Sequence, residues 1–199
     1  MKLICQGNEL SDALAKVVKA LPVKRNTPIL DGVKLTALGD TLTIFATDLE
    51  LAIEKKINAQ VLIEGEIVVP GKLFADYAKK IEEEQVELDG TDPTKLIIKY
   101  LDSELMIKCF SADEYPVFKE VDTQNSFIIL KKELKDIISK VIFNVAVDEA
   151  RPSLRGVCLN VKDEEVEAVA SDGYRLALAK AQINNNGFMS LAIGLSFFE

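Results

Sequence analysis

The sequence repeats itself after 124 residues, and this repeat limits the possible folds more than any other feature. Between residues 28 and 48, seven of 21 positions carry the residue found 124 positions later. The identical pairs are Pro28 and Pro152, Leu30 and Leu154, Gly32 and Gly156, Val33 and Val157, Leu35 and Leu159, Ala46 and Ala170, and Asp48 and Asp172. The period is too long for a solenoid, so it predicts two copies of one domain.

An amphipathic helix pattern occurs in both copies at the same displacement. Apolar residues recur at offsets 0, 3, 4, 7, 8 and 11 from Leu10 and again from Leu134. This spacing places them on one face of a helix. Asn8 can cap the first helix, and Pro22 ends it.

The rest of the first copy alternates apolar and polar residues, as strands do. The pattern predicts helices at 8–21 and 71–84, and strands at 2–6, 29–38, 41–47, 51–59, 64–69, 86–90, 95–101 and 104–110. An antiparallel sheet with two helices on one face is an α+β fold. We expect domains at 1–120 and 126–199, joined by a polar linker at 111–125.

The second copy is shorter than the first. Adding 124 to the helix predicted at 71–84 gives 195–208, and the chain has 199 residues. We therefore expect the second domain to be incomplete, that is, truncated, with an unpaired sheet edge.

Residue counts exclude several kinds of site. The chain has no histidine, which removes Ser-His-Asp and Cys-His nucleophiles and His-containing metal sites. Cys5, Cys109 and Cys158 are far apart, which favours free thiols in a cytoplasmic protein. No apolar run is long enough to span a membrane. We expect no cofactor and no metal.

Positive charge is segregated in a chain whose net charge is −8. Residues 1–25 carry five basic and two acidic side chains, whereas residues 82–93 carry six acidic ones and no base. At 100° per residue, lysines of the predicted helices lie opposite their apolar faces, with Lys16 on the flank of the first helix; the opposite-face lysines are Lys19, Lys72, Lys79, Lys80, Lys132 and Lys140. Any one could be ordinary solvated surface, but together they predict a basic helix-lined surface on an acidic body.

Six stretches carry a family resemblance: TPILDGVKL (27–35), FATDLELAI (45–53), VVPGKLFADYAKK (68–80), SADEYPVF (111–118), RPSLRGV (151–157) and VASDGYRLALAK (169–180). Through them the chain resembles the bacterial sliding clamp, the beta subunit of DNA polymerase III. The resemblance implies a DNA-clamp fold of three domains, closed head to tail as a homodimeric ring with helices lining the hole. It also implies a non-enzymatic processivity factor that encircles double-stranded DNA and tethers the polymerase.

The same resemblance assigns residues to three surfaces. DNA-binding positions are Lys24 or its neighbour Arg25, with Lys72 and Lys79. A groove for short peptide motifs of the polymerase III catalytic subunit and the clamp loader comprises Arg151, Leu154, Ser171, Gly173, Tyr174, Arg175 and Leu176. Leu105 and Ile107 match the subunit interface. The third domain of the family is absent here, so we expect that this chain alone cannot close the usual ring.

Other functions remain open on the residues alone. Asp48, Glu50 and Asp172 could hold magnesium in an acidic phosphodiesterase, although Asp48 and Asp172 are equivalent positions of two copies. A peptide-binding scaffold without DNA contact is a third possibility. Asp172-Gly173 is also typical of an ordinary hairpin turn, which is compatible with a groove.

Overall fold

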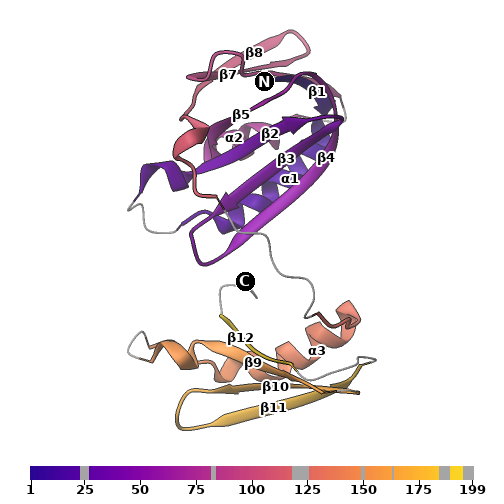
Figure 1. The fold of residues 1–199 in the computed structure, drawn as a ribbon, viewed down its shortest axis with the longest axis vertical. Coiled ribbons are helices and arrows are strands. Elements are labelled where there is room, and N and C mark those ends of the chain that lie inside the picture. The colour runs from indigo at the N-terminus through magenta and orange to yellow at the C-terminus, as the bar shows by residue number, and fades with distance from the viewer. Residues whose placement is uncertain are drawn as a thin grey trace. The chain divides into compact units, whose positions relative to one another are not determined.

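A computed structural model of the chain describes residues 1–22, 27–81, 84–117, 126–148, 151–162, 164–183 and 189–194. The chain divides into two compact units, Met1–Lys119 and Glu120–Glu199, called unit 1 and unit 2 below. Each unit has its own core, and each is described by itself (Figure 1).

Unit 1 is one antiparallel sheet of eight strands with two α-helices. The strand order is β5-β2-β3-β4-β1-β6-β7-β8. The strands are β1 (Lys2–Gln6), β2 (Gly32–Leu38), β3 (Thr41–Thr47), β4 (Ala52–Ile63), β5 (Gly65–Pro70), β6 (Gln85–Asp89), β7 (Lys95–Tyr100) and β8 (Ser103–Lys108). The helices are α1 (Gly7–Val17) and α2 (Gly71–Ala78), and the 3-10 turns are η1 (Val18–Ala20), η2 (Pro28–Asp31) and η3 (Ala112–Glu114).

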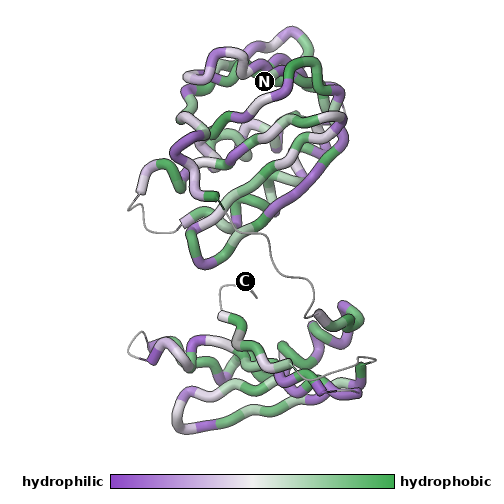
Figure 2. The backbone as a smooth tube through the Cα atoms, viewed as in Figure 1, coloured by the Kyte–Doolittle hydropathy of each residue, from purple (hydrophilic) through white to green (hydrophobic). Residues whose placement is uncertain are grey.

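The long strand β4 joins two four-stranded halves of this sheet. Its first part pairs with β3, ending at the pair of Thr41 and Asn58, and its second part pairs with β1 from Cys5 and Ala59 onward. Apolar side chains of the strands alternate toward α1 and α2, and Leu14, Ile44 and Phe74 are fully buried among them. Figure 2 shows this alternation of hydrophobic and hydrophilic residues along the strands. The α+β prediction is confirmed.

Several element boundaries differ from the predicted ones; α1 ends at Val17 rather than at 21, and β4 extends to Ile63 rather than to 59. The second helix ends at Ala78 rather than at 84, because Lys80 and Ile81 make shorter 3-10-type hydrogen bonds to Tyr77 and Ala78. The strand predicted from 29 begins at Gly32, since Pro28–Asp31 form a 3-10 turn. The predicted linker also begins too early, because Tyr115 is buried in unit 1.

Unit 2 repeats one half of unit 1. Its elements are α3 (Lys131–Val141), η4 (Ile142–Asn144), η5 (Pro152–Leu154), β9 (Gly156–Val161), β10 (Glu165–Ser171), β11 (Leu176–Gln182) and β12 (Met189–Gly194). The strand order β11-β10-β9-β12 matches β4-β3-β2-β5 when 124 is subtracted from each residue number. The predicted repeat of helix and strand order is therefore confirmed.

The cysteines are free thiols, as the sequence predicts. Cys5 is buried, and Cys109 and Cys158 are partly buried, all three as free thiols. Burial raises the pKa of the Cys5 thiol to about 12, so it stays protonated.

In the ranges that the structure describes, every helix is too short or too polar to cross a membrane.

Candidate partner groove and helix face

The turn between β10 and β11 is built by side chains that bond its backbone. The Ser171 hydroxyl donates to the Arg175 carbonyl at 2.8 Å and accepts from the Gly173 N–H at 3.1 Å. Asp172 Oδ1 accepts from the N–H groups of Tyr174 and Arg175, at 2.9 and 2.8 Å. Four hydrogen bonds thus fix the backbone at residues 171–175.

Asp172 remains ionised in this turn. Backbone hydrogen bonds from Arg175 and Tyr174, followed by the Arg175 side chain, hold the pKa of the Asp172 carboxyl well below its usual range. Oδ2 of Asp172 accepts from Nε and Nη2 of Arg175 at 3.0 and 2.8 Å. This paired contact orients Arg175, whose side chain is otherwise exposed to solvent.

Unit 1 contains the same turn, with the same bonds, 124 residues earlier. Thr47 Oγ1 donates to the Leu51 carbonyl at 2.8 Å and accepts from the Leu49 N–H at 2.9 Å. Asp48 Oδ1 accepts from the N–H groups of Glu50 and Leu51. The backbone φ is +80° at Leu49 and +90° at Gly173. The turn is therefore part of the duplicated fold. Only side chains that differ between the two copies can make the unit 2 turn a binding groove.

Arg151 and Leu154 pack onto the unit 2 turn at Gly173. A Cβ atom at position 173 would overlap the Arg151 guanidinium and touch Leu154. The Arg151 Cζ lies 6.0 Å from the ring centroid of Tyr174, within range of a cation–π contact. The structure therefore brings together the predicted groove residues of two separate segments.

Large apolar side chains are exposed on the strand that follows this turn. Tyr174 is 89% exposed, Leu176 66% and Leu178 51%. Leu176 and Leu178 share one face of β11, because successive strand residues point to opposite faces. Leu178 extends this exposed apolar surface beyond the predicted groove residues, as the alternation of leucine and alanine at 176–179 could have indicated.

The helix face of unit 1 carries the predicted lysines, with Lys72 on α2 and Lys79 and Lys80 directly after its last residue, Ala78. Phe74, Ala75 and Ala78 are buried, whereas Lys72, Lys79 and Lys80 are exposed. Lys79 pairs with Asp76 at 2.9 Å, so part of its charge is neutralised within the helix. A similar pair within α3, the counterpart of α1, joins Lys140 and Asp136 at 2.6 Å.

Two of the predicted DNA-binding residues have no structural description. Lys24 and Arg25 lie outside the described residues. The structure therefore places only Lys72 and Lys79 of that set, and Lys72 is the one whose ammonium group has no ion pair within the described part of the chain.

The predicted interface residues lie on β8, at the edge of the unit 1 sheet. Leu105 and Ile107 point to the same side as the fully buried Leu96 and Ile98, and Ile107 is only 2% exposed. Met106 points outward and is 58% exposed. A contact at this edge would therefore use the β8 backbone and Met106, with Ile107 supporting the strand from the core.

The magnesium alternative finds no support in these carboxylates. Asp48 and Asp172 each accept hydrogen bonds from their own turn, in different units. In the part of the chain that the structure describes, no three His, Cys, Asp or Glu side chains are grouped to hold a metal.

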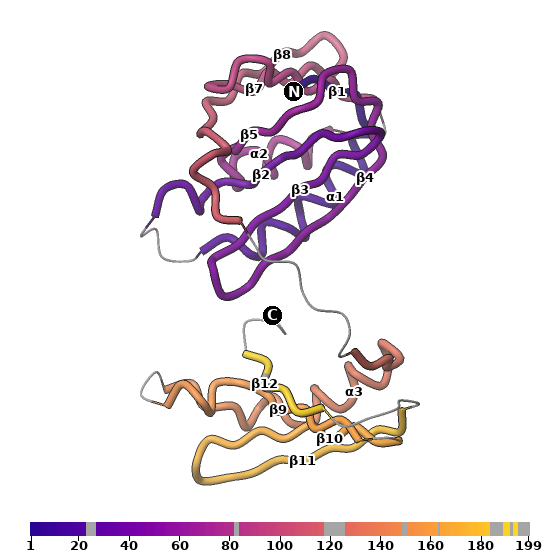
Figure 3. The backbone as a smooth tube through the Cα atoms, viewed as in Figure 1, coloured from indigo at the N-terminus to yellow at the C-terminus, as the bar shows by residue number. Residues whose placement is uncertain are grey.

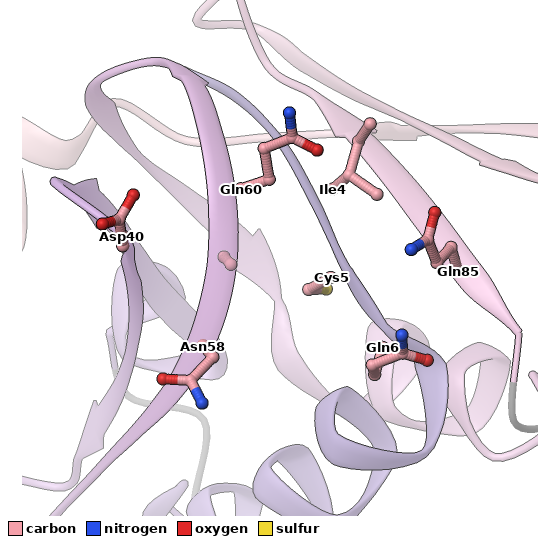
Figure 4. A pocket seen from close by; sticks show the side chains of 8 residues that line it. Ile4, Cys5, Gln6, Asp40, Asn58, Gln60 and Gln85 are labelled. Atoms are coloured by element: carbon pink, nitrogen blue, oxygen red, sulfur yellow. The ribbon is translucent and has the colours of Figure 1, made fainter.

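A hollow recurs at the same place in both units. In unit 1 it measures about 410 Å³ and lies where β1 leaves β4 to enter α1; Figure 4 shows Gln60 and Gln85 at its border, around Cys5. Its unit 2 counterpart measures about 510 Å³. Ile4, Cys5, Gln6, Asn58 and Ala59 line the first, and Ile128, Ile129, Leu130, Gln182 and Ile183, each 124 residues later, line the second.

The fold and the surfaces together define a clamp-type protein of duplicated α+β domains. Residues 1–119 match the DNA polymerase III beta subunit, N-terminal domain, and residues 128–192 match the central domain of the same subunit. The chain belongs to the DNA polymerase III beta subunit family.

Named relatives and solved structures agree with this assignment. The chain is 31% identical over 186 residues to the beta sliding clamp of Staphylococcus epidermidis, covering 89% of this chain and 48% of that protein. The beta sliding clamp of Bacillus subtilis is 31% identical over 192 residues, covering 92% and 51%. The chain thus spans about half the length of these relatives.

The solved clamps have the same fold. The crystal structure of the DNA polymerase sliding clamp from Bacillus subtilis matches with a TM-score of 0.93 and 28% identity, covering 98% of this chain and 54% of that chain. The DNA polymerase III beta subunit from Thermotoga maritima matches with a TM-score of 0.87 and 32% identity, covering 98% and 53%.

Proposed function

We propose that this chain functions as part of a sliding clamp, a non-catalytic processivity factor of the bacterial replicative DNA polymerase in the cytoplasm. The observation that carries the proposal is the exposed turn at 171–175, with Arg151 and Leu154 packed on it. The names of the relatives support the same function. Clamp domains are assigned to residues 1–120 and 126–199.

The groove binds short peptide motifs of the polymerase III catalytic subunit and the clamp loader. Leu154, Leu176 and Tyr174 offer apolar surface to leucine or phenylalanine anchors, and Arg151 and Ser171 provide its polar margin. Anchors of this kind account for most of the binding energy in small interfaces. This surface suits a short peptide with apolar anchor side chains.

A peptide titration tests the groove directly. Chemical shifts of Leu154, Gly173 and Leu176 should change on addition of a polymerase-derived peptide, and Leu176→Asp should weaken binding at least about thirtyfold, as loss of a ~2 kcal/mol anchor predicts. Leu38→Asp is the matched control, because Leu38 in unit 1 is 65% exposed and Leu176 is 66% exposed. Equal binding by both variants would place the groove elsewhere.

Duplex DNA lies against the helix face, through Lys24 or Arg25 together with Lys72 and Lys79. Contacts with phosphate carry no sequence information, which suits a protein that slides. Replacing these four residues by alanine should flatten the salt dependence of DNA binding by about 0.9 in logarithmic slope for each lost phosphate contact. A control with the same charge change replaces Lys34, Lys56, Lys95 and Lys99 on the strands.

The homodimeric ring of the family uses the β8 edge. Leu105 and Ile107 hold this strand in register from inside, and its free edge pairs with the partner subunit. Sedimentation of this chain mixed with a full-length relative tests the pairing. A charged substitution of Met106 should weaken it, whereas unchanged association would remove the β8 edge from the interface.

A further inference from the structure

The segment after β8 does not leave unit 1 directly. It turns back across the sheet, and Phe110 pairs with Val68 of β5. The Phe110 N–H donates to the Val68 carbonyl at 2.8 Å, and the Val68 N–H donates to the Phe110 carbonyl at 3.3 Å. Because β5 and β8 are the two ends of the strand order, this pair brings the ends together (Figure 3).

One side chain anchors the segment five residues further on. Tyr115 is 3% exposed, and its hydroxyl donates to the Gly32 carbonyl at 3.0 Å. Its ring meets the Phe45 ring edge to face, with centroids 6.0 Å apart. Burial raises the pKa of the Tyr115 hydroxyl to about 12, so the donor keeps its proton.

The other residues of the segment contribute little attachment. Ser111, Asp113 and Glu114 are exposed, and Val117 is 91% exposed. The short turn at 112–114 is closed by the bond from the Tyr115 N–H to the Ala112 carbonyl, at 3.1 Å. Attachment to unit 1 therefore depends on the Phe110 pair and on Tyr115.

We propose that Tyr115 is a latch that fixes where the chain leaves unit 1 and keeps Phe110 paired with β5. Among the described residues that follow Val117, Phe127 of unit 2 is the first that packs against a core. Phe127 follows Tyr115 by twelve positions and Cys109 by eighteen. Release of the latch would lengthen the greatest possible reach between the units by about 20 Å, at 3.3–3.6 Å per residue. The latch thus limits how far apart the surfaces of the two units can lie, and it does so whether or not they bind DNA.

Hydrogen exchange of the full chain tests the attachment. In Tyr115→Ala the Phe110 and Val68 amides should lose protection at least tenfold, while the amides of β2 and β3 keep theirs. Tyr115→Phe keeps the ring and removes only the hydroxyl, so its loss should be smaller. This milder variant also decides the matter if the alanine variant does not fold.

Tyr77→Ala is the matched control, because Tyr77 packs against the same core from α2 and lies outside the segment. Equal loss of Phe110 protection in Tyr77→Ala, or unchanged protection in Tyr115→Ala, would overturn the latch. Small-angle scattering tests the reach: the maximum dimension should grow in Tyr115→Ala and not in Tyr77→Ala. Equal dimensions would refute the claim that the latch limits the separation.

Discussion

Gly173→Ala should lower the free energy of unfolding more than the same substitution at another glycine with a positive φ. Gly39 also has a positive φ, +57°, and a Cβ there would have open space around it. Gly39→Ala therefore measures the backbone term alone, about 1–2 kcal/mol for an L-residue in the left-handed region. Gly173→Ala adds the overlap with the Arg151 guanidinium.

The added cost follows from what Arg151 loses by moving. Its contact with the Tyr174 ring is at an exposed site, where such contacts contribute ~0.5–1 kcal/mol. We therefore expect Gly173→Ala to destabilise unit 2 by about 1.5–3 kcal/mol in total. In an Arg151→Ala background the extra cost should vanish, leaving the value of Gly39→Ala.

Leu49→Gly is the reciprocal change in unit 1. It relieves the left-handed backbone, but a glycine also loses about 0.5–1 kcal/mol more entropy on folding, so the net effect should be near zero or slightly stabilising. Urea unfolding followed by hydrogen exchange of β3 and β10 amides would report each unit separately. If Gly173→Ala costs no more than Gly39→Ala, Arg151 does not press on the turn.

Three further predictions follow from titratable groups. Asp172 has a folded-state pKa below its unfolded value near 3.9, so its contribution to the stability of unit 2 is present above about pH 4 and is lost as the pH falls; acid unfolding of Asp172→Asn should show a weaker pH dependence, and an identical profile would contradict the turn bonds. Cys5, with a pKa of about 12, should resist a thiol reagent at pH 8 until the protein unfolds, as mass spectrometry of the labelled peptides can check. Tyr115 should ionise only near pH 12, and this step should be missing from the ultraviolet titration of Tyr115→Phe.

Sequence patterns predicted what repeats along the chain and missed what depends on distant contacts. The period of 124 residues predicted the matching strand order, because apolar alternation is local. The closeness of Arg151 to Gly173 could not be predicted from spacing, since 22 residues and a strand pair separate them. The Lys79–Asp76 pair lay within one helix turn and could have been found.

Two side chains are more buried than local patterns indicated. Ile107 pairs with the core residue Leu96, so its side chain points inward, and its assignment to the interface stays a prediction. Tyr115 was placed in a linker because its neighbours are polar, yet one aromatic ring was enough to attach the segment. Leu49 shows the converse, because a non-glycine residue adopts a positive φ when side-chain hydrogen bonds hold the turn.

The hollow that borders β1 in unit 1 and recurs in unit 2 shows how a cavity can arise from a duplicated fold alone. Its place is set by the segment that leads into the first helix of each copy, since equivalent residues border it in both units. Its lining has diverged, with Gln6 in one unit and Leu130 in the other. Each unit can therefore be compared with the other copy. A hollow present in both copies follows from the shared fold, and selection for a ligand would be visible only in lining side chains that differ between the copies.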